Sequence, residues 1–100
     1  MRYTEYNIDA LVQIFDGPAA WFFIFVPKDT SLDIKKGFGD RSRGWGSLPV
    51  EVTVGETIWR TSIFYDRKEE KFMLPLKASV RKAENIIEGK RITISIEIII

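Results

Sequence analysis

The sequence contains no cysteine and no histidine among its 100 residues. The lack of cysteine excludes disulfides and thiolate nucleophiles within this chain, and the lack of both excludes zinc sites built from Cys and His. Without histidine, a Ser-His-Asp triad is also excluded. Acid–base chemistry would have to rest on Asp, Glu, Lys or Tyr alone. We therefore predict that the protein is not an enzyme and holds neither a cofactor nor a metal ion.

A long hydrophobic run is absent too. The longest apolar stretch, residues 19–26, has eight residues, whereas a membrane-spanning helix needs about 20. The N-terminus lacks an apolar signal core followed by a small-residue cleavage site. These features predict a cytoplasmic protein with no membrane partner. Frequent isoleucine, with Lys and Glu making up just over half of the charged residues, is a hint of a thermophilic source.

Neither basic nor acidic residues are in large excess. The formal net charge is +1, which is too small to indicate nucleic-acid binding by itself. The first 27 residues are slightly acidic and the remainder is slightly basic. Solvated surface charge explains this mild asymmetry more readily than a binding surface does.

The apolar pattern is mostly that of strands. Apolar and polar residues alternate in residues 6–15, 48–54 and 92–98. Strands 45–54 and 57–64, joined by a tight turn, predict a β-hairpin, and a shorter strand is predicted at 72–76. Residues 20–26 are apolar on both faces, which predicts a central strand buried on both sides. We accordingly expect Trp21, Phe22, Phe23 and Phe25 to lie in the core.

Two short segments have helical features. In residues 28–37, Thr30 followed by Asp33 resembles a capping box, and Gly37 can end one or two helical turns. A second helix is predicted from an apolar stripe formed by Leu76, Val80, Ala83 and Ile87, with Gly89 breaking it. About six strands and two short helices predict one mainly β domain over residues 1–100, a small barrel or sandwich.

Several segments, in order, resemble one bacterial and archaeal family, the domain-of-unknown-function 1905 family. They are residues 21–27, 44–50, 55 with 59–63, 74–77 with 80–83, and 89 before the last strand. The resemblance implies a double-split β-barrel, similar to swapped-hairpin DNA-binding proteins of the antitoxin and transition-state-regulator type. Lys90 departs from the pattern of those regulators, which have Asp after the glycine. The resemblance implies a fold and a family but no activity.

The second predicted helix carries the first candidate site. Lys77 and Arg81 are one turn apart and project together, and Lys82 flanks them. Such a cluster could bind phosphate groups. The alternative is a solvated helix face on which Arg81 contacts Glu84 or Asn85.

A second candidate lies in the glycine-rich loop before residue 46. Arg41, Arg43 and Trp45 would form a simple platform for single-stranded nucleic acid, because the tryptophan ring can stack on a base. The alternative is that Trp45 closes one end of the barrel core. A non-enzymatic binding or interaction module is thus the first hypothesis, and nucleic-acid binding through the basic loop and basic helix is the second.

The third hypothesis is a small enzyme. Asp9, Glu51 and Glu97 lie on polar strand faces, where two carboxylates could converge with a lysine. For the assembly, we expect a monomer rather than a homodimer, although residues 98–100 form an apolar strand edge that a neighbouring chain could pair with.

Overall fold

The computed structural model describes residues 4–17, 20–41 and 46–99, which form a mainly β structure with two helices. The elements in chain order are β1 (Glu5–Leu11), β2 (Gln13–Phe15), β3 (Trp21–Phe25), α1 (Lys28–Phe38), the 3₁₀ turn η1 (Gly39–Arg41), β4 (Ser47–Val54), β5 (Thr57–Asp66), β6 (Lys71–Leu76), α2 (Ala78–Ala83) and β7 (Arg91–Ile98). The strands form one antiparallel sheet in the order β1-β7-β4-β5-β6-β3-β2. The predicted mainly β fold is confirmed.

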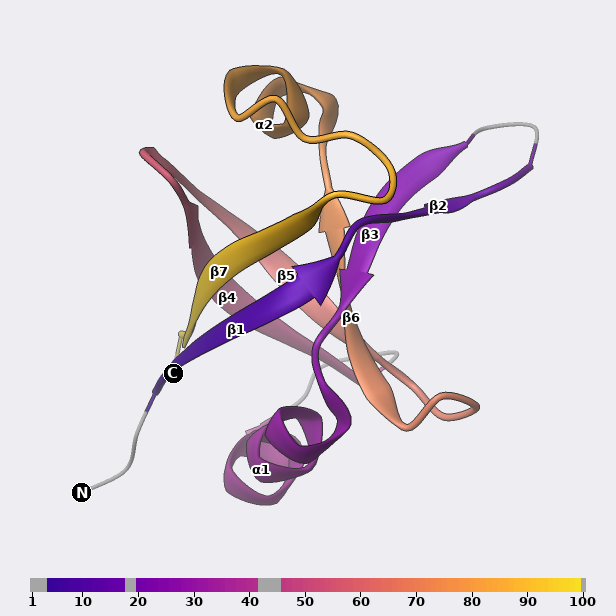
Figure 1. Cartoon of the computed structure of the whole chain (residues 1–100). Helices are drawn as coiled ribbons and strands as arrows, with labels where there is room; N and C mark the ends of the chain where they lie inside the picture. Colours follow the sequence, from indigo (N-terminus) through magenta and orange to yellow (C-terminus); the bar gives the residue numbers. More distant parts are fainter. Residues whose placement is uncertain (1–3, 18–19, 42–45, 100) are drawn as a thin grey trace.

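The sheet curls because its two outermost strands are consecutive in the chain. Only Val12 separates β1, which pairs with β7, from β2, which pairs with β3. The Val12 backbone accepts a hydrogen bond from the Gly89 N–H and donates one to the Lys90 carbonyl, both at 2.9 Å. The two ends of the sheet therefore meet at one bent stretch of chain, and the sheet forms a half-barrel (Figure 1).

The core lies on the concave side and follows the predicted alternation. The inward residues of β4 and β7 are all buried: Leu48, Val50, Val52, Val54, Ile92, Ile94, Ile96 and Ile98. Burial of each such side chain stabilises the fold by about 1.5–3 kcal/mol relative to exposure. These two strands lie side by side, so their branched side chains form the centre of the core.

The aromatic strand β3 differs from the prediction that all four of its rings lie in the core. Phe22 packs against the core from its edge, and Phe23 is buried outside the core cluster. Trp21 and Phe25 are half-buried. Successive residues of a strand point to opposite faces, so Trp21, Phe23 and Phe25 form a separate row on the other face. Their ring centroids are 5.3 and 5.2 Å apart, and Phe15 extends the row at 5.9 Å from Trp21.

Helix α1 is longer than the predicted one or two turns, with 11 residues. Pro27 is its N-cap and no side chain caps it, so the capping box of Thr30 and Asp33 is wrong. Gly39, in a right-handed conformation, is the C-cap in place of Gly37. The polar residue that secures this helix is Ser31, which is completely buried. Its hydroxyl donates to the Val26 carbonyl and accepts from the Phe72 N–H, both at 2.9 Å, and so joins α1 to the strand layer.

Helix α2 is shorter than predicted and ends at Ala83, well before Gly89. The predicted stripe fails at its end, because Ala83 is exposed and Ile87 is 66% exposed. Asn85 adopts a positive φ of 54°, which breaks the helical phase. Ile86 takes the buried position instead.

The turn before β7 accommodates Lys90 by a different contact from the one an aspartate would make. Gly89 has a φ of 83°, a conformation that favours glycine. The Lys90 ammonium donates to the Asn85 carbonyl at 3.2 Å, so lysine closes the turn as a donor.

The apolar C-terminal stretch is not a free strand edge in this chain. β7 is paired on both sides, by β1 and β4. The Ile98 N–H donates to the Thr4 carbonyl and the Ile99 N–H to the Pro49 carbonyl. The expected open edge at residues 98–100 is therefore wrong for Ile98 and Ile99, and residue 100 lies outside the described part.

Candidate binding site

Strand β5 has one fully paired edge and one that is mostly unpaired. On the first edge, β4 pairs with eight of its residues, from Thr57 to Phe64. On the second edge, β6 pairs with only three, from Phe64 to Asp66. From Phe64 toward the start of β5 the two strands separate, and they diverge in Figure 1. The sheet is thus split between the first half of β5 and the second half of β6.

The alternation of hydrogen bonds identifies the backbone groups that face this split. Val54 and Thr57 close a two-residue hairpin turn, so they form a hydrogen-bonded pair. Bonded pairs alternate along an antiparallel ladder, which directs the N–H and C=O groups of Trp59, Thr61 and Ile63 toward β4. The same groups of Ile58, Arg60 and Ser62 point to the β6 side, where no strand pairs with them among the described residues.

Pro75 explains why the ladder stops. Continuing the register beyond the Phe64–Met73 pair would place Ser62 opposite Pro75. The Phe72 carbonyl accepts from Val26, so Phe72, Leu74 and Leu76 direct their backbone groups toward β3, and Pro75 faces β5. Proline has no N–H to donate to the Ser62 carbonyl. A proline inside a predicted strand is a sequence signal for such an edge, and it could have indicated the split.

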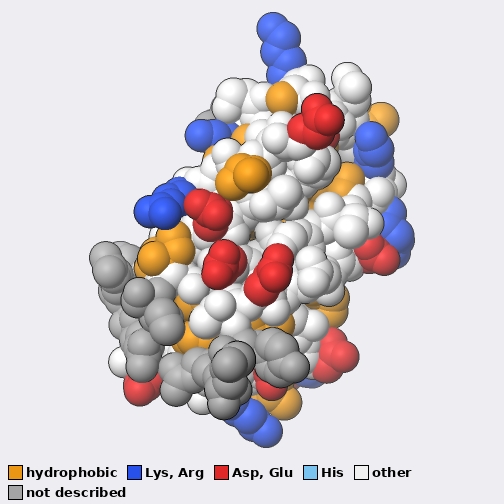
Figure 2. All heavy atoms as spheres, turned by 90° about the vertical axis from the view of Figure 1, so that its left-hand side faces the viewer, with side chains coloured by type: hydrophobic (Ala, Val, Ile, Leu, Met, Phe, Trp, Pro, Cys, Tyr) orange, Lys and Arg blue, Asp and Glu red, His pale blue; other side chains and the backbone are white. Residues whose placement is uncertain are grey.

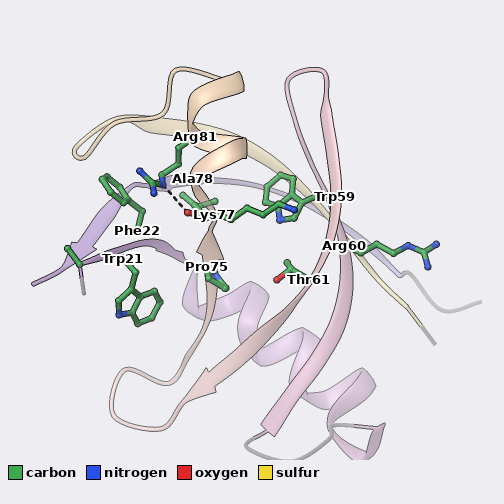
Figure 3. A pocket seen from close by; sticks show the side chains of 11 residues that line it. Trp21, Phe22, Trp59, Arg60, Thr61, Pro75, Lys77, Ala78 and Arg81 are labelled. Atoms are coloured by element: carbon green, nitrogen blue, oxygen red, sulfur yellow. Dashed lines mark hydrogen bonds between the residues drawn. The ribbon is translucent and has the colours of Figure 1, made fainter. Parts of the chain in front are cut away.

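The split contains a pocket with a volume of about 310 Å³. Strand β3 contributes Trp21 and Phe22 to its lining, β5 contributes Trp59, and the segment from β6 into α2 contributes Leu76, Lys77 and Arg81. The pocket thus combines aromatic and apolar walls with two basic side chains (Figure 3). A concave apolar site with a few convergent polar groups is typical of ligand pockets, and this volume is at the small end of their range.

Arg81 is held in place on the pocket wall. Its Nε donates to the Leu76 carbonyl at 3.0 Å, and its guanidinium lies 3.8 Å from the centroid of the Phe22 ring. Neither of the predicted contacts, with Glu84 or Asn85, is the one observed. These two interactions fix the plane of the guanidinium and leave its terminal amino groups available to a ligand.

Lys77 is the second basic group, four residues before Arg81. It is exposed, and its side chain extends from the start of α2 toward β5 in Figure 3. Among the described residues, the salt bridges join Lys28 to Glu70 and Arg60 to Glu51, so neither Lys77 nor Arg81 is paired with a carboxylate there. The predicted pair is therefore brought together at one pocket.

The other predicted site residues do not join this pocket in the described structure. Lys82 is exposed on α2 and does not line the pocket. Arg43 and Trp45 lie outside the described residues, as does the side chain of Arg41 at the end of η1. Arg60 lines the pocket, but its side chain points away from it in Figure 3 and lies 3.4 Å from Glu51. The pocket is also lined by Trp21 and Phe22, which we expected in the core, and by Trp59, which the sequence did not single out as a site residue.

Glu84 closes the end of the split nearest the β4–β5 turn. The residue follows α2 directly, and its carboxylate accepts a hydrogen bond from the Thr57 hydroxyl at 2.5 Å. The opposite end is closed by the Phe64–Met73 pair. The split is consequently a window with two closed ends rather than an open channel.

The outer face of β1, β7 and β4 has the opposite charge. Acidic side chains gather in the middle of the face shown in Figure 2. Glu97 lies directly across from Glu5 on one side and from Glu51 on the other. Asp9 is separate and accepts a hydrogen bond from the Thr93 hydroxyl. Among the described residues, the salt bridge of Glu51 is made with Arg60 at 3.4 Å.

Comparisons with known proteins identify a family. The sequence matches the family model described as Domain of unknown function (DUF1905) over residues 9–96, which is most of the chain. No curated protein matches the sequence. In the part of the chain that the structure describes, no helix has the length and apolar character needed to cross a membrane.

The family-model match over residues 9–96 confirms the resemblance seen in the sequence, and the chain belongs to the DUF1905 family.

Proposed function

We propose that this protein is a non-enzymatic binding module whose ligand site is the pocket between β5 and β6. The ligand carries a negative charge on an apolar or planar body. The observation that carries this proposal is the position of Lys77 and Arg81, two basic groups without a carboxylate partner among the described residues, on a pocket walled by aromatic rings.

The held arginine supports this choice of charge. A guanidinium binds a carboxylate or phosphate through two parallel hydrogen bonds, and such charge-assisted bonds are stronger than neutral ones. Because Leu76 and Phe22 already fix the Arg81 side chain, binding costs less conformational entropy than it would for a mobile arginine.

Nucleic-acid binding is a second candidate at the same pocket. Trp21 and Trp59 lie beside the two basic groups, and an aromatic ring that stacks on a base contributes about 1–3 kcal/mol per base. This candidate predicts tight binding of a short single-stranded oligonucleotide, with an affinity that falls steeply as salt rises.

Nuclear magnetic resonance titration tests the proposed site. Benzoate and inorganic phosphate would be added separately to ¹⁵N-labelled protein, and we expect benzoate to shift the signals of Arg81 and the Trp59 indole. Arg81→Ala should weaken benzoate binding by about tenfold or more, because a hydrogen bond to a charged group contributes about 1.5–3 kcal/mol. Lys82→Ala is the matched control, since it removes the same charge from α2 outside the pocket. Absence of any shift with both anions, or equal weakening by Lys82→Ala, would contradict the proposal.

A further inference from the structure

We infer that the ligand is the C-terminal end of another protein chain, which enters the window between β5 and β6 in an extended conformation. This inference rests on the proposed function and specifies its ligand. It follows from four features of the window: its free backbone groups, its closed ends, its charge and its apolar wall.

The free backbone groups of β5 match an extended peptide. Ile58, Arg60 and Ser62 direct their N–H and C=O groups into the window, where no strand pairs with them among the described residues. A peptide that adds a strand to an open sheet edge gains its affinity from such groups. The edge from Ile58 to Ser62 is about 13 Å long at about 3.3 Å per residue, which is enough for two to four residues.

The closed ends of the window favour a chain terminus over an internal segment. The Phe64–Met73 pair closes one end, and the Thr57–Glu84 hydrogen bond closes the other. An internal segment would have to thread through the window or bend sharply at both ends. A chain terminus enters from one side and needs neither. The volume of about 310 Å³ also suits the last few residues rather than a long segment.

The charge of the window selects the C-terminal end of the chain. Lys77 and Arg81 supply two positive groups, which suits a single carboxylate. A nucleic-acid strand would bring a row of phosphates to the same place. A flanking phosphate would meet the carboxylate of Glu84 at the end of the window. A peptide carboxylate avoids that repulsion because its charge is confined to the chain end.

The apolar wall determines the preferred last residue. Trp59 is 8% exposed and Leu76 is 2% exposed, so both present packed, largely dehydrated surfaces to the pocket. A branched apolar side chain would gain contact with these surfaces. A charged side chain would lose hydration there, because the terminal carboxylate already occupies Lys77 and Arg81. We therefore expect a preference for valine, isoleucine or leucine at the C-terminal position.

Fluorescence anisotropy with a matched pair of peptides tests the inference. The probe is fluorescein-labelled Gly-Ser-Thr-Val-Thr-Val with a free carboxylate, and its control is the same peptide with an amidated C-terminus. We expect the free acid to bind at least tenfold more tightly than the amide. Arg81→Ala and Lys77→Ala should remove most of this difference, and Lys82→Ala should leave it unchanged. Thermal unfolding of each variant verifies that it is folded.

Hydrogen exchange supplies a readout that a merely electrostatic contact would not change. Saturating free-acid peptide should slow exchange of the Arg60 and Ser62 amides by at least tenfold, because these N–H groups would then donate to the peptide. Equal binding of acid and amide, or unchanged exchange at both amides, would overturn the inference.

Two further arms separate the inference from the proposed function. If benzoate binds the pocket and the peptide does not, the inference fails while the proposed anion site stands. If neither binds, both fail. If a labelled eight-nucleotide oligothymidine binds more tightly than the free-acid peptide, with sensitivity to Arg81→Ala, the ligand is nucleic acid and the inference is overturned.

Discussion

The two edges of β5 differ in how completely they are paired. On one edge, β4 pairs with β5 from Thr57 to Phe64, next to the buried ladder of β4 and β7. On the other edge, pairing ends after three residues, and a basic, aromatic pocket occupies the space that a paired strand would fill. One strand thus joins the stable part of the sheet to the part where backbone groups remain free for a ligand.

The largest expected effect comes from damage to the buried side of β5. Ile63 is completely buried, so Ile63→Ala should lower the free energy of unfolding by about 2–5 kcal/mol through lost apolar contact and a cavity. Urea denaturation measures this change. Ile58→Ala, on the same strand at a side chain that is 62% exposed, is the control and should change stability by no more than about 0.5 kcal/mol. Similar losses for the two variants would contradict the assignment of faces.

The next effect concerns how the start of β6 is held on the edge that faces away from β5. The Ser31 hydroxyl contacts both the Phe72 N–H and the Val26 carbonyl, so Ser31→Ala leaves two buried backbone groups without this partner. We expect a loss of about 1–3 kcal/mol in urea denaturation, which is the cost of an unsatisfied buried polar group. Ser79→Ala, at an exposed position of α2, should have almost no effect. A fully stable Ser31→Ala protein would show that α1 does not anchor β6.

Pro75→Ala should reduce the difference between the two edges. The variant supplies an N–H opposite Ser62, so the β5–β6 ladder can extend by one hydrogen bond. We expect a gain of at most about 0.5–1.5 kcal/mol in unfolding free energy, together with weaker benzoate binding because the window narrows. Slower exchange of the Ser62 amide would accompany these changes. A variant with unchanged exchange and unchanged binding would show that Pro75 does not keep the split open.

The smallest effect is expected at an exposed ion pair that does not line the pocket. Lys28 and Glu70 form an exposed pair at 2.9 Å. The hydrogen bond and charge of Lys28 lower the pKa of Glu70, and Glu70 in turn raises the pKa of Lys28. The stabilisation by Glu70 is therefore present above its unfolded pKa and is lost as the pH falls through its lowered folded pKa.

Glu70→Gln tests this pair. The variant should be slightly less stable than the wild type at about pH 7, and the difference should vanish at about pH 2 and shrink in high salt. Urea denaturation at both pH values measures it. A difference that grows toward acid pH would contradict the direction of the Glu70 shift.

Periodicity predicted the strands well because burial on one face imposes a period of two. The alternation in residues 48–54 and 92–98 appears directly as buried and exposed side chains. The prediction that every ring of the aromatic strand lies in the core was wrong, because an apolar run does not determine whether the second face of its strand is covered. Trp21 and Phe25 are only half-buried there. The end of α2 misled for a local reason, since Asn85 changes the helical phase before Ile86.

The candidate site was predictable only in part. The spacing of Lys77 and Arg81 was enough to place them on one side of a helix, and the two do line one pocket. The walls of that pocket come from strands that are distant in the sequence, β3 and β5. Their meeting depends on where the β5–β6 ladder ends, which is a tertiary feature. Pro75 is the feature of the sequence that indicates where the β5–β6 ladder ends. That it would lie opposite Ser62 follows only from the pairing register.

Amide hydrogen exchange along β5 of the free protein tests the central claim most directly. The account predicts alternating protection: slow exchange at Trp59 and Thr61, whose N–H groups bond to β4, and fast exchange at Arg60 and Ser62, whose N–H groups face the window. The expected ratio between neighbours is at least tenfold. Equal, strong protection at Thr61 and Ser62 would mean that β5 is paired on both edges and that the window does not exist.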